Sequence, residues 1–217
     1  MNNTTITRVL ATIETAVIAL DDPLATEDTT DGDPYRILIS CLLSQRTKEE
    51  TTLQASRRLF AAAATPLDMV ALSSEQIETL IYPVGFWKTK ARHILSLSSI
   101  LLSRHGGMVP ADMGALLQLP GVGRKTANLV LADAFGIPAI CVDIHVHRIM
   151  NRLGFVHTAT PEDTETSLRH RLPRELWMNV NYLLVLFGRN ICTPQSPRCS
   201  LCPVRADCAQ RLVIRSR

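Results

Sequence analysis

The stretch that decides the fold is LPGVGRKTA, residues 119–127. It joins two segments with helical spacing of apolar residues, one from Asp112 to about Leu119 and one from Arg124 to Phe135. Gly121 and Gly123 let the backbone turn tightly and approach a ligand. The free N–H groups of the turn and of the following helix start point outward, and the helix dipole adds partial positive charge. The stretch predicts a helix–turn–helix corner suited to a phosphate oxygen, and a corner that merely joins two helices is the alternative.

Lys125 is the unusual residue of this stretch. It falls in the first turn of the second helix, where the helix dipole disfavours a cation. A corner that only joins two helices does not need a lysine at this position. A lysine amine can act as a nucleophile and form a Schiff base. The position of Lys125 therefore indicates a chemical role.

A second motif, VDIHVHR at residues 142–148, follows the lysine. Asp143 begins a predicted helix, and its ordinary role there is that of an N-cap. The alternative is a carboxylate that faces Lys125, which lies 18 residues earlier in the chain. His145 and His147 have no third ligand nearby for a zinc ion, so surface or phosphate contact is the better interpretation.

Four of the six cysteines lie within 17 residues in the pattern C-x6-C-x2-C-x5-C. They are Cys192, Cys199, Cys202 and Cys208. Four thiolates on one compact loop can ligate a 4Fe–4S cluster, one per iron. Zinc is the alternative, but structural zinc usually takes two close pairs, and only one is present. The spacing favours a cluster with a structural role, because a proline-rich segment has little fold without its ligand.

The rest of the chain is predicted to be helical, so the fold class is all-α. Helix starts are marked by Asp33-Pro34, Thr47-x-x-Glu50, Thr65-Pro66, Ser73-x-x-Gln76 and Thr160-Pro161. A long helix from about Trp87 to Arg104 stops at Gly106-Gly107. The last long helix is expected from Glu175 to Leu186, closed by Gly188. No run of alternating residues predicts a strand.

Composition narrows the class of protein. The 217 residues carry a net charge of +3, but residues 1–35 have seven acids and one base, and residues 186–217 have six bases and one acid. A basic C-terminal segment is compatible with a polyanion partner. No stretch has 18 apolar residues, which excludes a membrane-spanning helix. The N-terminus lacks the features of a signal peptide, so a cytoplasmic protein with reduced thiols is expected.

Taken together, these motifs resemble the endonuclease III family of the helix–hairpin–helix superfamily. The resemblance rests on residues 119–136, on VDIHVHR and on the cysteine tail, and it extends to LLSQRT (42–47) and PVGFWKTKA (83–91). It implies two α-helical domains and a monomer. One is a six-helix domain at 28–137, and the other joins 1–27 to 138–217 and carries the 4Fe–4S cluster.

The resemblance also implies roles for individual residues. Lys125 matches the family's nucleophile and Asp143 its essential carboxylate, while the four cysteines match the cluster ligands. Gly121, Val122 and Gly123 match the phosphate-binding turn.

Three further positions match parts of the family that contact the opened duplex. His145 matches a residue near the void left by the extruded base, and Gln45 and Phe86 match loops inserted into the duplex. Phe86 replaces the usual leucine wedge. The sequence Ser44-Gln45-Arg46 replaces S-x-Q, which leaves open whether Gln45 or Arg46 fills the void.

The activity implied by the resemblance is that of a bifunctional DNA glycosylase and abasic-site lyase. Its partner is double-stranded DNA containing damaged bases or abasic sites. The reaction removes oxidised pyrimidines through a lysine Schiff base and cuts 3′ to the lesion by β-elimination. Two alternatives are a mismatch glycosylase for adenine or thymine, which usually lacks the lysine, and a DNA-binding module without catalysis. Nicking of abasic DNA separates the enzyme from the binding module.

Overall fold

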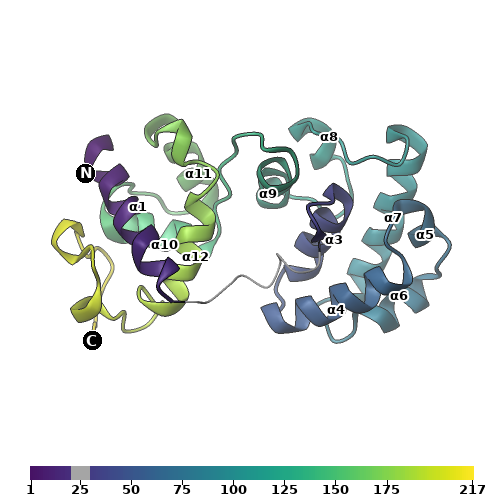
Figure 1. The fold of residues 1–217 in the computed structure, drawn as a ribbon, viewed down its shortest axis with the longest axis horizontal. Coiled ribbons are helices and arrows are strands. Elements are labelled where there is room, and N and C mark those ends of the chain that lie inside the picture. The colour runs from purple at the N-terminus through teal and green to yellow at the C-terminus, as the bar shows by residue number, and fades with distance from the viewer. Residues whose placement is uncertain (21–29) are drawn as a thin grey trace. The chain divides into compact units, whose positions relative to one another are not determined.

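The computed structural model describes residues 1–20 and 30–217, and in these ranges it contains helices and no strand (Figure 1). The predicted all-α class is confirmed. The chain folds as two compact units, Ala25–Ile137 and a discontinuous unit of Met1–Leu24 with Pro138–Arg217. The domain boundary expected between residues 27 and 28 lies outside the described residues. None of the helices in the described ranges combines the length and apolar character needed to cross a membrane.

The continuous unit is built around a buried helix. Its helices are α3 (Pro34–Ser44), α4 (Glu49–Ala62), α5 (Pro66–Val70), α6 (Ser74–Ile81), α7 (Trp87–His105), α8 (Met113–Leu117) and α9 (Arg124–Phe135). Helix α3 packs against α4, α7 and α9, which explains why it is apolar on nearly all sides. At the helix starts predicted from Asp33, Thr65 and Ser73, the side chain of each residue accepts a backbone N–H, and Asp112 does the same at the start of α8.

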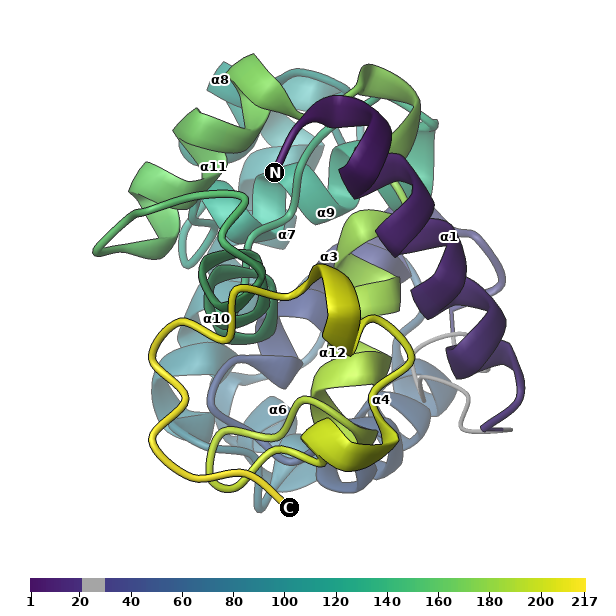
Figure 2. The same cartoon turned by 90° about the vertical axis from the view of Figure 1, so that its left-hand side faces the viewer.

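The discontinuous unit has its own core. Its helices are α1 (Asn3–Ile18), α10 (Ile144–Leu153), α11 (Pro161–Arg171) and α12 (Val180–Asn190). Helix α12 packs against α1 and α10, and Phe155 and Phe187 are among the fully buried side chains. Figure 2 shows the C-terminal segment as loops with short helical turns. Cys192, Cys202 and Cys208 of this segment pack against the core.

Three local predictions are wrong, and two of them have a tertiary reason. The last long helix begins at Val180 and not at Glu175, because Arg174–Leu176 form a separate 3-10 helix. Helix α4 begins at Glu49 with no side-chain cap, because the hydroxyl of Thr47 accepts the N–H of Gly85 at 3.1 Å instead of forming the predicted capping box. Gly188 does not close a helix and lies buried inside α12. A Cβ there would collide with side chains of His145 and Arg148 from α10, so the glycine permits close helix packing.

Candidate functional site

The two glycines of the corner between α8 and α9 lie in different surroundings, and only Gly121 is restricted to glycine by its backbone and its neighbours. Gly121 has φ +80°, and a Cβ there would lie 2.7 Å from Nδ1 of His93. Gly123 is the N-cap of α9, offers no side-chain cap, and has open space where its Cβ would be. Val122 between them is buried and anchors the turn. The N–H groups of the first turn of α9 therefore remain available to an anion that approaches the backbone.

Lys125 lies directly behind this corner, at the second residue of α9. Its side chain is exposed. Within the part of the chain that the structure describes, its amine forms neither a hydrogen bond nor an ion pair. The amine is therefore free to react with a ligand bound at the corner.

Asp143 is the N-cap of α10 in the discontinuous unit. Its Oδ1 accepts the backbone N–H groups of His145 at 2.8 Å and Val146 at 2.9 Å. Asp143 therefore has the N-cap role that is its ordinary role at a helix start. Both bonds use the same oxygen, and among the described residues Oδ2 has no hydrogen-bond partner. One carboxylate can therefore hold the helix start and still present a charged oxygen.

The side chain of His145 is turned toward its own unit. It is half-buried, and its Nδ1 lies 3.2 Å from the guanidinium of Arg148. Arg148 also donates to the carbonyls of Gly188 and Cys192. His145 is therefore held between α10 and the end of α12.

The loop after α3 reaches the glycine corner. The amide Nε2 of Gln45 donates to the carbonyl of Gly121 at 3.1 Å and to the hydroxyl of Thr126 at 3.3 Å. Phe86 is 61% exposed, which excludes a core role for this aromatic ring. The guanidinium of Arg46 lies 5.7 Å from the ring centroid of Phe86, a cation–π distance. Gln45, Arg46 and Phe86 therefore lie on neighbouring loops of one unit.

Lys90 is a buried charged residue that the sequence reasoning missed. It is only 5% exposed, and Nζ donates to the carbonyl of Leu43 at 2.8 Å, to the carbonyl of Gln45 at 2.6 Å and to the hydroxyl of Thr47 at 3.2 Å. Burial lowers the pKa of Lys90 to about 8. Helical periodicity is the sequence signal that indicates its burial. Ile94 follows Lys90 by four residues, so both side chains lie on the buried face of α7.

We expect Lys90→Met to change how stability depends on pH. The folded-state pKa of about 8 lies below that of a free lysine, so between about pH 8 and 10.4 the unfolded chain binds more protons. The free energy of unfolding of the wild type therefore rises with pH across this window. Lys90→Met removes this rise, up to roughly 3 kcal/mol. Urea unfolding of the wild type and of Lys90→Met at pH 7.5 and pH 10 measures this difference. Equal pH dependence of the free energy of unfolding in both proteins contradicts the lowered pKa of Lys90.

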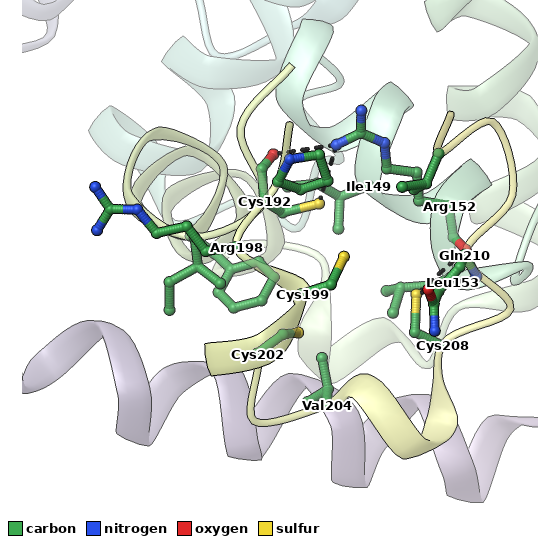
Figure 3. A pocket seen from close by; sticks show the side chains of 14 residues that line it. Ile149, Arg152, Leu153, Cys192, Arg198, Cys199, Cys202, Val204, Cys208 and Gln210 are labelled. Carbon is green, nitrogen blue, oxygen red and sulfur yellow. Dashed lines mark hydrogen bonds between the residues drawn. The ribbon is translucent and has the colours of Figure 1, made fainter. Parts of the chain in front are cut away.

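The four clustered cysteines surround one pocket (Figure 3). All are free thiols, and Ile149, Leu153 and Phe187 provide apolar lining. Nη1 of Arg152 donates to Sγ of Cys192 at 3.3 Å. No three His, Cys, Asp or Glu side chains of residues 1–20 and 30–217 form a group that could hold one metal ion. Ligands spread around a shared pocket suit a multi-iron cluster, with one thiolate per iron, better than one tetrahedral zinc.

The electrostatics of this pocket also fit a cationic iron core. Burial raises the pKa of Cys202 and Cys208, and charge repulsion from the neighbouring thiols adds to the rise. Four thiolates are therefore unfavourable here unless a metal group compensates their charge. The residues present fit a cluster that binds thiolates.

Comparison with known proteins identifies the class. The family described as "HhH-GPD superfamily base excision DNA repair protein" matches residues 39–174, which include the glycine corner, Lys125 and Asp143. The "Iron-sulfur binding domain of endonuclease III" matches residues 192–208. The fold and site are those of a base excision DNA repair protein with a 4Fe–4S cluster.

Individual relatives narrow the class further. Endonuclease III of Thermotoga maritima is 49% identical over 178 residues, which are 82% of this chain and 84% of that protein. Endonuclease III-like protein 1 of Bos taurus is 45% identical over 80% of this chain and 58% of its own greater length. A solved trapped endonuclease III–DNA covalent intermediate has a TM-score of 0.85 and 35% identity, with 97% of each chain covered. The chain belongs to the endonuclease III family of DNA glycosylases and abasic-site lyases.

Proposed function

We propose that the protein removes oxidised pyrimidines from double-stranded DNA and cuts the strand 3′ to the lesion through a Schiff base on Lys125. The observation that carries this proposal is the exposed amine of Lys125, which pairs with none of the described residues and lies directly after the open glycine corner. A phosphate held by the N–H groups around Gly121, Val122 and Gly123 brings an adjacent sugar within reach of that amine. The proposal includes a monomer that acts in the cytoplasm.

The proposed reaction has two stages. The damaged nucleotide leaves the base stack, which costs a few kcal/mol and costs least for a damaged base. The amine of Lys125 attacks the anomeric carbon, the glycosidic bond breaks, and the base leaves with a proton. The bound sugar opens to a Schiff base. The neighbouring carbon then loses a proton, and β-elimination expels the 3′ phosphate.

Asp143 supports the charge that develops on the sugar. A carboxylate stabilises a cationic sugar and assists ring opening without becoming part of a covalent bond. Its Oδ1 is used by the helix cap, so Oδ2 is the oxygen assigned to this role. The rigid start of α10 holds the carboxylate in one orientation.

Four side chains are assigned to the opened duplex. Phe86 acts as the apolar wedge, and Gln45 or Arg46 fills the void, with His145 near it. The exposure of Phe86 and its contact with Arg46 support the placement of both on a DNA-facing surface.

The cysteine segment is assigned to the cluster. Cys192, Cys199, Cys202 and Cys208 would each ligate one iron. When bound, the cluster supplies a structural tie for a segment that consists of loops and short 3-10 turns. Arg152 orients the Cys192 end of this segment through its bond to Sγ and through a 2.7 Å bond to the carbonyl of Thr193.

A panel of duplexes tests the proposed substrate class. Each duplex carries one oxidised pyrimidine, uracil, a mismatched adenine or thymine, or an abasic site. We expect base release and strand cleavage with oxidised pyrimidines, and strand cleavage at abasic sites. Activity confined to mismatches contradicts the proposed substrate, and binding without nicking leaves only a DNA-binding module. Light scattering of the free protein and the complex tests the monomer.

Phe86→Ala should weaken binding to lesion DNA and leave the fold stable. The ring is 61% exposed, so its loss creates no core cavity. Phe155→Ala is the matched control, because Phe155 is fully buried and a core truncation of this kind costs about 3–5 kcal/mol. Binding titrations and thermal unfolding of both variants measure the two effects. The wedge role is refuted if Phe86→Ala binds lesion DNA as tightly as the wild type.

The purified protein should be yellow-brown and contain about four irons per chain. Cys202→Ser should reduce iron content, solubility and DNA affinity more than it changes the reaction of surviving protein, because the ligand organises the segment. Cys41→Ser is the matched control, since Cys41 is buried in α3 of the other unit. Full iron content in Cys202→Ser contradicts the ligand assignment.

A further inference from the structure

Lys90 holds the loop that follows α3. Its ammonium group binds the carbonyls of Leu43 and Gln45 and the hydroxyl of Thr47, as described above. The carbonyl of Leu43 lies in the last turn of α3, where carbonyls lack intrahelical partners. Three bonds from one buried cation therefore determine the path of residues 43–47.

The same loop is joined to the loop that carries Phe86. The hydroxyl of Thr47 accepts the N–H of Gly85 at 3.1 Å, one residue before Phe86. A Cβ on Gly85 would lie 2.5 Å from the carbonyl oxygen of Arg46, so the two backbones approach as closely as glycine permits. Lys90, in the first turn of α7, lies behind this junction.

The outward side chains of the two loops are those assigned to DNA. Gln45 reaches the glycine corner, and Arg46 stacks on Phe86. Both Arg46 and Phe86 have a left-handed backbone conformation, with φ of 52° and 58°. Such conformations persist only where surrounding contacts impose them. The contacts of Lys90 and Thr47 supply such a constraint for Arg46.

We propose that Lys90 is a positioning residue for lesion recognition, which holds Gln45 and Arg46 in register with Phe86 so that both loops enter the duplex as one rigid element. This inference rests on the proposed function. Lys90 does not touch DNA, because its amine is buried among backbone carbonyls. It acts through the residues that it places.

A double-mutant cycle of Lys90→Met and Gln45→Ala tests the proposal. The readouts are affinity for a duplex with one oxidised pyrimidine and the fluorescence of 2-aminopurine placed opposite the lesion, which reports unstacking. We expect Lys90→Met to lose roughly 10–100-fold in affinity, the scale of a misplaced contact, and to give a smaller fluorescence rise. The double variant should bind the lesion duplex with the same affinity as the single variant that binds it more weakly, because both changes act through one loop.

Leu101→Ala is the matched structural control. Leu101 is fully buried on α7, eleven residues beyond Lys90, so its truncation lowers stability without touching the loop. It should retain wild-type fluorescence and add independently to Gln45→Ala. Additive losses for Lys90→Met, or a fluorescence response equal to that of Leu101→Ala, overturn the proposal.

Thr47→Val is a second variant that tests the same proposal if Lys90→Met does not fold. It removes one of the three acceptors of Lys90, the bond from Gly85 and the bond that the Thr47 hydroxyl donates to the carbonyl of Gln45, while it keeps Lys90. It should show the same non-additivity with Gln45→Ala, and additivity overturns the proposal. Failure of the proposed function gives a different result, because the wild type itself then releases no base from lesion DNA.

Discussion

Lys125→Gln abolishes both the borohydride-trapped protein–DNA adduct and strand cleavage, and retains binding to lesion DNA. This is the largest effect expected of any single substitution in the chain. Only an amine forms the imine that borohydride reduces, and glutamine has no such nucleophile. Binding persists because Gly121 and Gly123 still present the open N–H groups of the corner.

The measurement is denaturing electrophoresis of an abasic duplex after turnover with borohydride, followed by peptide mapping of the adduct in the wild type. The adduct should map to Lys125. Lys88→Gln is the matched control, because Lys88 is an exposed lysine that also lies in the first turn of a helix. A Lys125→Gln protein that nicks abasic DNA at the wild-type rate defeats the assignment and leaves a monofunctional or non-catalytic protein.

Asp143→Asn lowers the single-turnover rate by roughly 100–1000-fold, the usual cost of removing one electrostatic stabiliser. Asparagine is as good an N-cap as aspartate, and its side-chain oxygen can still accept the N–H groups of His145 and Val146. The substitution therefore removes the charge and leaves the start of α10 in place. Lesion affinity and thermal stability should stay close to the wild-type values.

Asp33→Asn is the control for this change. Asp33 caps α3 through a 2.9 Å bond from the N–H of Arg36, so the same chemical change is made at a second helix start. It should leave the rate unaltered. Equal rates for wild type and Asp143→Asn reduce Asp143 to a capping residue. A large loss of stability in Asp143→Asn shows instead that the cap is the reason for any lost activity.

Short-range chemistry explains which parts of this fold were predictable. An N-cap needs only a side-chain oxygen and a backbone N–H two or three residues later, so Asp33-Pro34 and Ser73-x-x-Gln76 marked their helices correctly. The same holds for the site. Lys125 follows Gly123 by two residues, and the four cysteines lie within 17 residues, so local spacing was enough to predict the lysine at the corner and the grouping of the cysteines.

Two of the wrong local predictions, those for Thr47 and Gly188, show where reasoning from neighbouring residues fails. Thr47 has the spacing of a capping box, but Gly85 and Lys90 arrive from 38 and 43 residues away and bind its hydroxyl. A hydroxyl near a helix start can accept a hydrogen bond from the helix or from a distant segment that packs against it. Residue spacing alone does not predict which of the two donors it binds. Gly188 likewise resembles a helix end in the sequence. In the structure it lies inside α12, where the close approach of α10 requires a glycine.

The sequence by itself determined the all-α class, most helix starts, the glycine corner with its lysine, and the grouping of four cysteines, because each depends on residues close together in the chain. Only the tertiary structure decided that Phe86 is exposed, that Gln45 rests on the corner, and that Lys90 is buried under the loop after α3. These features depend on which backbone groups of distant helices are left without partners. A buried cation can only be assigned a role once those unsatisfied carbonyls are known.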